Sequence, residues 1–372
     1  MPTLDQVQGL LLGHAVGDMA GAPFEFMDYV EFRATASTYR GNRISLPGIH
    51  PRYPNKFAYT TDDDAHMNIV GQSFVTMGCF DMDDICRRFI EWYNGGDAPG
   101  IGGSTALALN LLDPLEQKYP VHWTVAGKEA RNISPSMHQG RNNEQGFLLY
   151  SFPSNGPLMR VPILGLFAKG RELERNVHDL TRITHDYQVN YVTSAIAAKV
   201  VEMIVEGMPK TEIKKQILDK YKKVIQRCEH ALKPYNGEAF GIRKNYYGDY
   251  PKDFGLGGSA EVTLAIALRA FFETDNFDEA ICFGVNARNT VKEWCWDVDT
   301  YTALIGAFAG CYYGANSIGN HWRYPVHPAT GDVHDITPIS CSEILSLGKN
   351  LHKTLGLQKP IFLSSFSAAF IA

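Results

Sequence analysis

The amino-acid sequence predicts an all-α protein. Through long segments of its 372 residues, apolar side chains recur with a period near 3.6, which is typical of helices that bury one face. Segments in which apolar and polar residues alternate, as in a half-buried strand, are scarce. Two segments far apart in the chain carry the same stripe of small residues, which predicts a tightly packed helical centre.

The first expected helix, at about residues 4–21, has a glycine at every fourth position: Gly9, Gly13, Gly17 and Gly21. Residues four apart share one face of a helix, so these glycines form a bare stripe, although each costs about 1 kcal/mol of helix propensity. The segment after Thr300 repeats the pattern with Thr302, Gly306, Gly310 and Gly314. We therefore expect another backbone to pack very closely against each stripe.

Further helices are expected where the same periodicity returns. They lie at about residues 64–78, 83–94, 104–113, 190–206, 211–231, 259–273, 277–288 and 341–354. Longer irregular stretches, rich in Gly, Pro, Asn and aromatic residues, lie at about 27–58, 114–160, 232–258 and 315–338. Loops of this length usually build a site or an interface. No linker-like stretch separates independent parts, so we expect one compact domain over residues 1–372.

Composition and charge exclude several classes of protein. Hydrophobic residues make up 45% of the chain and charged residues 20%, which is typical of a globular protein. The net charge is -5, and the basic cluster at residues 210–227 interleaves with apolar residues at helical spacing. This cluster predicts a solvated helix face, so no nucleic-acid partner is expected. The seven cysteines include no CxxC pair, which argues against a zinc knuckle or a disulfide framework.

The sequence indicates neither a membrane protein nor a secreted one. In a membrane the glycine stripe would mark a dimerisation face, but His14, Asp18 and the short apolar spans favour close packing in a soluble protein. No run of 18 residues is free of charges and turn formers, and residues 1–6 lack the basic residues that precede a signal-peptide core. We therefore expect a cytoplasmic location and no membrane partner.

Two acidic clusters are candidates for a metal site. In the first, Asp62, Asp63 and Asp64 open a predicted helix just after Thr61, where the helix dipole favours negative charge. One carboxylate is enough to cap a helix, and three adjacent ones repel each other unless a cation is bound. Ligands that are all oxygen atoms point to magnesium, manganese or calcium.

The second cluster also opens a helix. Asp297, Asp299 and Thr300 project two carboxylates and a hydroxyl from one helical turn. Either cluster alone is also explained as an ordinary helix start, but the two glycine stripes give a physical reason for these remote segments to meet. The sequence therefore predicts one split metal site, with these ligands: Thr61, Asp62, Asp63, Asp297, Asp299 and Thr300.

Four motifs spread over nearly the whole chain occur together in one known family. The opening helix runs into Gly17-Asp18-Met19-Ala20-Gly21-Ala22-Pro23-Phe24-Glu25, and the later motifs are Thr61-Asp62-Asp63, Asn155-Gly156-Pro157-Leu158-Met159-Arg160 and Asp297-Val298-Asp299-Thr300. In these motifs the sequence resembles the ADP-ribosylglycohydrolase family. It departs from the family pattern at Asp64, where threonine is common, at Pro157, where small residues are usual, and at Cys295-Trp296, where two glycines are typical.

The resemblance implies an orthogonal helical bundle and a hydrolase that removes ADP-ribose from a modified protein side chain, with arginine as the expected acceptor. It implies two magnesium ions, or manganese, at the predicted site. By the same resemblance, Asp62 and Asp63 would also move protons, and Glu25 would be a third acid. The loop at residues 155–160, called the substrate loop below, would wrap the diphosphate of ADP-ribose, and His185, which follows Thr184, would lie in the substrate cleft. The implied substrate-binding residues are Asn155, Gly156, Leu158, Met159 and His185.

Three other functions stay open from the sequence. A non-catalytic protein would bind ADP-ribose, or would shield a target protein from modification by covering its surface. A related hydrolase would act on serine-linked or O-acetyl ADP-ribose, because the residues that select the acceptor lie in loops. A metal-dependent hydrolase of another phosphorylated nucleoside would keep the acidic site without needing the loop at residues 155–160. The oligomeric state is not indicated by the sequence.

Overall fold

The computed structural model confirms the all-α class. It describes residues 1–25, 57–96, 98–115, 117–118, 120–137, 153–231, 258–287, 297–327 and 330–357. Its α-helices are α1 (Leu4–Gly21), α3 (Asp62–Met77), α4 (Met82–Asn94), α5 (Gly103–Leu112), α6 (Trp123–Met137), α7 (Leu164–Phe167), α8 (Gly170–Arg182), α9 (Gln188–Val205), α10 (Lys210–Ala231), α11 (Ala260–Glu273), α12 (Phe277–Asn286), α13 (Val298–Tyr313), α14 (Asn320–Arg323) and α15 (Cys341–Leu357). Across these ranges β pairing is limited to isolated bridges. None of the helices described combines the length and the apolar character that crossing a membrane requires.

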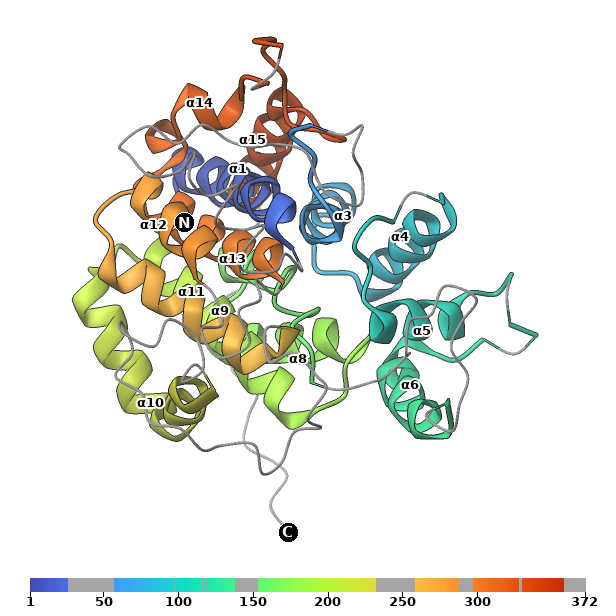
Figure 1. The fold of residues 1–372 in the computed structure, drawn as a ribbon. Helices are drawn as coiled ribbons and strands as arrows, with labels where there is room; N and C mark the ends of the chain where they lie inside the picture. The colour runs from blue at the N-terminus through green and yellow to red at the C-terminus, as the bar shows by residue number, and fades with distance from the viewer. Residues whose placement is uncertain are drawn as a thin grey trace.

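Helices α1 and α13 lie side by side at the centre of the molecule (Figure 1). A Cβ atom added to any glycine of the first stripe would lie only 2.1 to 2.3 Å from a carbonyl oxygen at the start of α13 or within it. Added to Gly306 or Gly310, it would lie 1.9 or 2.0 Å from a carbonyl oxygen of α1. The predicted close packing is therefore confirmed, and each stripe is the partner of the other. The contact is antiparallel, because Gly9 meets Gly310 and Gly21 meets Val298.

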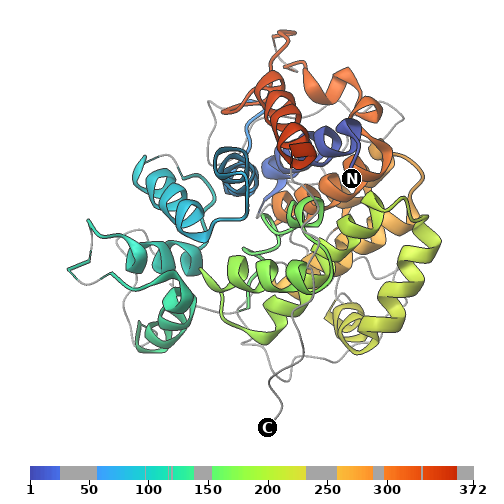
Figure 2. The same cartoon turned by 180° about the vertical axis from the view of Figure 1, so that it is seen from behind.

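The remaining helices surround this pair. Helix α15 packs on α1 and α3, while α11 and α12 pack on α13. Helices α4, α5 and α6 lie on one side of the molecule and α10 to α12 on the other, as both views show (Figures 1 and 2). Every residue from Gly9 to Gly21 of α1 is buried. The C-terminal end of α1 and the N-terminal end of α13 therefore meet inside the protein.

Several expected boundaries are wrong. Helix α3 begins at Asp62 rather than at residue 64, so the three aspartates form its first turn. The stretch at 114–160, expected to be irregular, contains α6, and the stretch at 315–338 contains α14 and a 3-10 helix, Ala315–Ser317. Most of the expected stretches at 27–58 and 232–258 lies outside the described residues.

Two of the longer helices, α6 and α8, are absent from the expected set for different reasons. The core residues of α6 include Ala126 and Ala130, which are too small to give a clear hydrophobic period. Helix α8 is rich in charged residues but has its buried hydrophobic residues, Leu173, Val177 and Leu180, at the i, i+4 and i+7 positions of one helix face, so its omission from the expected helices is wrong. Tertiary packing stabilises α6, whose local pattern is weak.

Candidate active site

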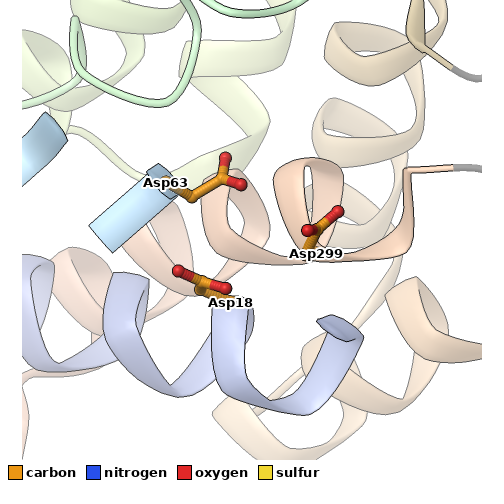
Figure 3. A group of neighbouring side chains, drawn as sticks. All are labelled: Asp18, Asp63 and Asp299. Carbon is orange, nitrogen blue, oxygen red and sulfur yellow. The ribbon is translucent and has the colours of Figure 1, made fainter. Parts of the chain in front are cut away.

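Three carboxylates from three helices face one another beside the central helix pair (Figure 3). Asp18 lies near the end of α1, Asp63 in the first turn of α3 and Asp299 in the first turn of α13. One oxygen of each lies within 4.8 Å of the others, and all three residues are buried. Glu25, Asp297 and Asp299 form a second group within the same limit. The structure therefore brings the two predicted acidic clusters together, and it adds Asp18.

The two threonines of the predicted ligand set connect these carboxylates. The Oγ1 atom of Thr61 lies 2.9 Å from an oxygen of Asp18 and 3.3 Å from an oxygen of Asp63 and from one of Asp299. The Oγ1 atom of Thr300 lies 3.2 Å from Asp63 and 3.4 Å from Asp297. Since a hydroxyl has one hydrogen, each threonine can donate to only one of these carboxylates at a time. The remaining oxygen lone pairs stay available to a cation.

Asp18 belongs to the first family motif, but its place in the site is not predicted by the sequence. Its carboxylate accepts hydrogen bonds from the backbone amides of Thr61, at 2.9 Å, and Asp64, at 3.0 Å. It therefore caps the N-terminus of α3 from another helix, so the carboxylates of α3 itself are not needed for capping. The sequence does contain a signal for this role. Asp18 lies on a helix whose glycine stripe predicts a central position, and a buried charge without a partner would be costly there.

The carboxylates are crowded and shielded from water. Burial raises the pKa of Asp18, Asp62 and Asp63 well above the ordinary value for aspartic acid, and the negative charge of Asp299 raises all three further. The Oδ1 atom of Asp63 is buried without a hydrogen-bond partner. A divalent cation would neutralise the charges and bind the free oxygen atoms. An all-oxygen set of this kind fits a hard cation such as magnesium, manganese or calcium.

Asp62 and Asp297 are the remaining carboxylates of the predicted ligand set. Asp62 is buried, and its amide donates to the carbonyl of Pro99 at 2.9 Å. Asp297 has a φ of 34°, in the left-handed region that few non-glycine residues adopt. Its side chain accepts a hydrogen bond from Asn155. Backbone strain at this position is therefore associated with a contact between the acidic centre and the predicted substrate loop.

The substrate loop is fixed from several directions. The amide of Asn155 donates to the carbonyl of Gly258 at 2.9 Å, and its side chain also donates to Thr263 at 2.9 Å. A Cβ atom added to Gly156 would lie 2.9 Å from the ring of His185, so only glycine fits there without a shift. The structure thus places three of the predicted substrate-binding residues, Asn155, Gly156 and His185, in one group.

The other predicted residues of this loop are buried in the core. The side chains of Leu158 and Met159 are 0% and 5% exposed, and the amide of Leu158 already donates to the carbonyl of Asn155. His185 is also fully buried, and both of its ring nitrogens contact protein hydroxyls, those of Thr184 and Ser154. Contact of these three side chains with a substrate therefore stays a prediction.

Comparison with known proteins agrees with this arrangement. Residues 1–358 match the model of a family described as ADP-ribosylglycohydrolase. The chain belongs to this family. An ADP-ribosyl-[dinitrogen reductase] glycohydrolase of Rhodospirillum rubrum is 26% identical to this chain over 322 residues, covering 86% of this chain and 89% of the relative. An ADP-ribosylarginine hydrolase, Tri1 of Serratia proteamaculans, is 21% identical over 326 residues, covering 86% of this chain and 75% of the relative.

A solved structure confirms the type of fold. A chain of an ADP-ribosylglycohydrolase-related protein complex superposes with a TM-score of 0.63 at 23% identity, and the match covers 95% of this chain and 98% of that one. The ADP-ribosylglycohydrolase fold therefore accounts for nearly the whole molecule.

Of the departures from the family pattern, those at Asp64 and Pro157 lie among the described residues. Asp64, where threonine is common, places an oxygen 3.9 Å from Nδ1 of His14, and both residues are buried. The carbonyl of Pro157 accepts hydrogen bonds from the amides of Arg160 and Val161, so proline is accommodated in a tight turn. Cys295 and Trp296 lie outside the described residues.

Proposed function

We propose that the protein hydrolyses the glycosidic bond between ADP-ribose and a side chain of a modified protein, with arginine as the acceptor. The observation that carries the proposal is the hydrogen bond from Asn155 to Asp297, which joins the substrate loop directly to the acidic centre. A diphosphate held by that loop would place its attached ribose beside the carboxylates. The name of the Serratia relative supports arginine as the acceptor.

Two divalent ions, which we propose to be magnesium or alternatively manganese, would be held by the six ligands that the sequence predicts: Thr61, Asp62, Asp63, Asp297, Asp299 and Thr300. When bound, such ions orient sugar hydroxyls and lower the pKa of a coordinated water molecule. The fit is supported by the all-oxygen composition of the site and by the unpartnered oxygen of Asp63.

The chain's own residues would provide the proton transfers and the electrostatic stabilisation. Water adds a hydroxyl group to the anomeric carbon, while the bond to the acceptor nitrogen breaks and its electron pair stays on that nitrogen. Positive charge develops on the sugar during this step, and buried carboxylates stabilise it. Asp62 or Asp63 would take the proton from water and give a proton to the leaving nitrogen, with Glu25 as the third acid near the centre.

The direct test is release of ADP-ribose from arginine-modified and serine-modified protein substrates, with and without magnesium. We expect release from the arginine substrate that stops on chelation and is absent in an Asp62→Ala/Asp63→Ala variant. An Asp219→Ala variant, which removes an exposed carboxylate on α10, should behave as wild type. Release that persists in the double variant would contradict the proposed site. Release from the serine substrate alone would change the acceptor, and binding without release would favour a shielding protein.

Metal binding can be tested separately from activity. Magnesium or manganese should raise the unfolding midpoint of the chelator-treated protein, because a ligand that binds only the folded state stabilises it by about 2.7 kcal/mol at a hundred times its dissociation constant. Thermal unfolding of the Asp62→Ala/Asp63→Ala variant should show no such shift. A shift of equal size in both proteins would place the bound ion elsewhere.

A further inference from the structure

Arg160, the last residue of the substrate loop, is buried. The side chain of Arg160 is 0% exposed. Its guanidinium donates to the carbonyl of Gly156 at 3.1 Å, to the carbonyl of Leu180 at 3.4 Å and to the hydroxyl oxygen of Thr184. Burial lowers the pKa of Arg160 to about 9, so it is a cation at neutral pH. Because a guanidinium can only donate, the oxygen of Thr184 must accept.

This acceptor role determines which nitrogen of His185 carries the hydrogen. The Nδ1 atom of His185 lies 2.8 Å from the same Thr184 oxygen. Burial lowers the pKa of His185 to about 3, with a further contribution from Arg160, so the ring is neutral and has one hydrogen. If Nδ1 held it, the buried hydroxyl hydrogen of Thr184 would have no acceptor, which disfavours that form by about tenfold. Thr184 therefore donates to Nδ1, and the hydrogen of His185 is on Nε2.

The next hydrogen bond in the series joins His185 to Ser154 and runs in the direction that the protonated Nε2 requires. The Nε2 atom of His185 lies 2.6 Å from Oγ of Ser154. Since Nε2 donates, the hydroxyl hydrogen of Ser154 points away from the histidine. Ser154 is partly exposed, and its carbonyl is held by the side chain of Asn190 at 2.6 Å. Its neighbour Asn155 donates to Asp297, so Ser154 is one residue away from the contact between the loop and the acidic centre.

We propose that Arg160, Thr184 and His185 orient the hydroxyl of Ser154 as a hydrogen-bond donor to an anionic oxygen of a bound diphosphate. This inference rests on the proposed function and adds Ser154 to its binding residues. Arg160, Thr184 and His185 are positioning residues. The loop has a specific need for such a donor, because Pro157 has no amide hydrogen to offer. Because Nε2 of His185 donates to the oxygen of Ser154, the hydroxyl hydrogen of Ser154 remains available for donation to the diphosphate.

The direction of the chain of hydrogen bonds is tested by nitrogen-15 NMR of the histidine rings, with the His185 signals assigned by their loss in His185→Gln. We expect wild type and Thr184→Ser to show the Nε2-protonated ring, uncharged between pH 5 and 8. Thr184→Val, which keeps the shape but removes the hydroxyl, should show a mixture of the Nε2-protonated and Nδ1-protonated forms of the ring. A wild-type ring protonated on Nδ1 would overturn the proposal, whatever the activity of the protein.

The role of Ser154 is tested by calorimetric titration with ADP-ribose in the presence of magnesium. Ser154→Ala should bind about tenfold more weakly than wild type, as expected for one lost hydrogen bond to a charged acceptor. Ser346→Ala, which changes an exposed serine on α15, should bind as wild type, and both variants should unfold at the wild-type midpoint. Equal affinity of Ser154→Ala and wild type would overturn this role but leave the proposed function standing. If wild type binds no ADP-ribose, the proposed function fails together with the assignment of Ser154 to a diphosphate, while the NMR result stands alone.

Discussion

Replacing Gly13 by alanine is expected to destabilise the folded protein by about 3 kcal/mol or more, because overpacking against rigid backbone cannot be relieved by a side-chain movement. The new Cβ atom would lie 2.2 Å from the carbonyl oxygen of Gly306. Alanine favours a helix by about 1 kcal/mol over glycine, so intrinsic propensity acts in the opposite direction and is outweighed. Urea unfolding, followed by circular dichroism, measures the change.

Gly102 provides the matched control. It precedes α5 with a φ of -70°, and no atom lies within 4 Å of an added Cβ. Gly102→Ala should change the free energy of unfolding by less than about 1 kcal/mol. If Gly13→Ala unfolds at the same urea concentration as this control, the backbones of α1 and α13 are not in contact as described.

Replacing Asp63 by asparagine is expected to reduce hydrolysis by about 10³-fold while making the metal-free protein more stable by roughly 1 to 2 kcal/mol. Asparagine keeps the shape but cannot replace the charge or move a proton. The stabilisation follows because Asp63 is buried among Asp299, Asp18, Asp62 and Asp297, whose charges repel it. Activity assays and urea unfolding in a chelator check both parts.

The pH dependence of stability has opposite signs at two kinds of aspartate. A carboxyl group with a higher pKa in the folded protein binds more protons when folded, so the metal-free centre gains stability as the pH falls from neutral towards 4. At Asp84, burial alone would raise the pKa, but hydrogen bonds from Arg88 and Arg87 outweigh it and lower the pKa to about 2. The stabilisation from Asp84 is therefore present above about pH 4 and is lost as the pH falls towards 2.

Asp84→Asn is consequently the control for Asp63→Asn. It should destabilise the protein at neutral pH, because it removes the acceptor of these arginine hydrogen bonds, and it should leave hydrolysis close to wild type. A metal-free Asp63→Asn variant that is also less stable than wild type would contradict the account of a repulsive centre.

The parts of the molecule that could be predicted from sequence are those in which spacing alone carries the information. Gly9 and Gly13 have no side chain, so their spacing indicates a close neighbour without identifying it, and the repeat at Gly306 identifies the neighbour. Adjacent aspartates such as Asp62 and Asp63 are costly unless they bind a cation, so their position is informative as well. Both inferences needed only short-range patterns.

The parts that could not be predicted depend on contacts between distant residues. Asp18 has no acidic neighbour in the sequence, and its role follows only from the hydrogen bonds that it accepts from the amides of Thr61 and Asp64. The link from Arg160 through Thr184 to Ser154 joins segments whose separation gives no periodic signal. In α6 the buried residues include Ala126 and Ala130, which are too small to give a clear hydrophobic period. These features result from tertiary packing, which overrides local preference.

The contact between α1 and α13 also determines when during synthesis the active site can form. Because Gly9 meets Gly310, helix α1 is synthesised about 300 residues before its partner. Until then α1, which is buried on nearly every side in the finished protein, has no surface to cover it. Such late, non-local pairing makes folding slow and leaves apolar surface exposed to aggregation. A chain that stops before residue 297 therefore lacks both its central packing and half of its acidic centre.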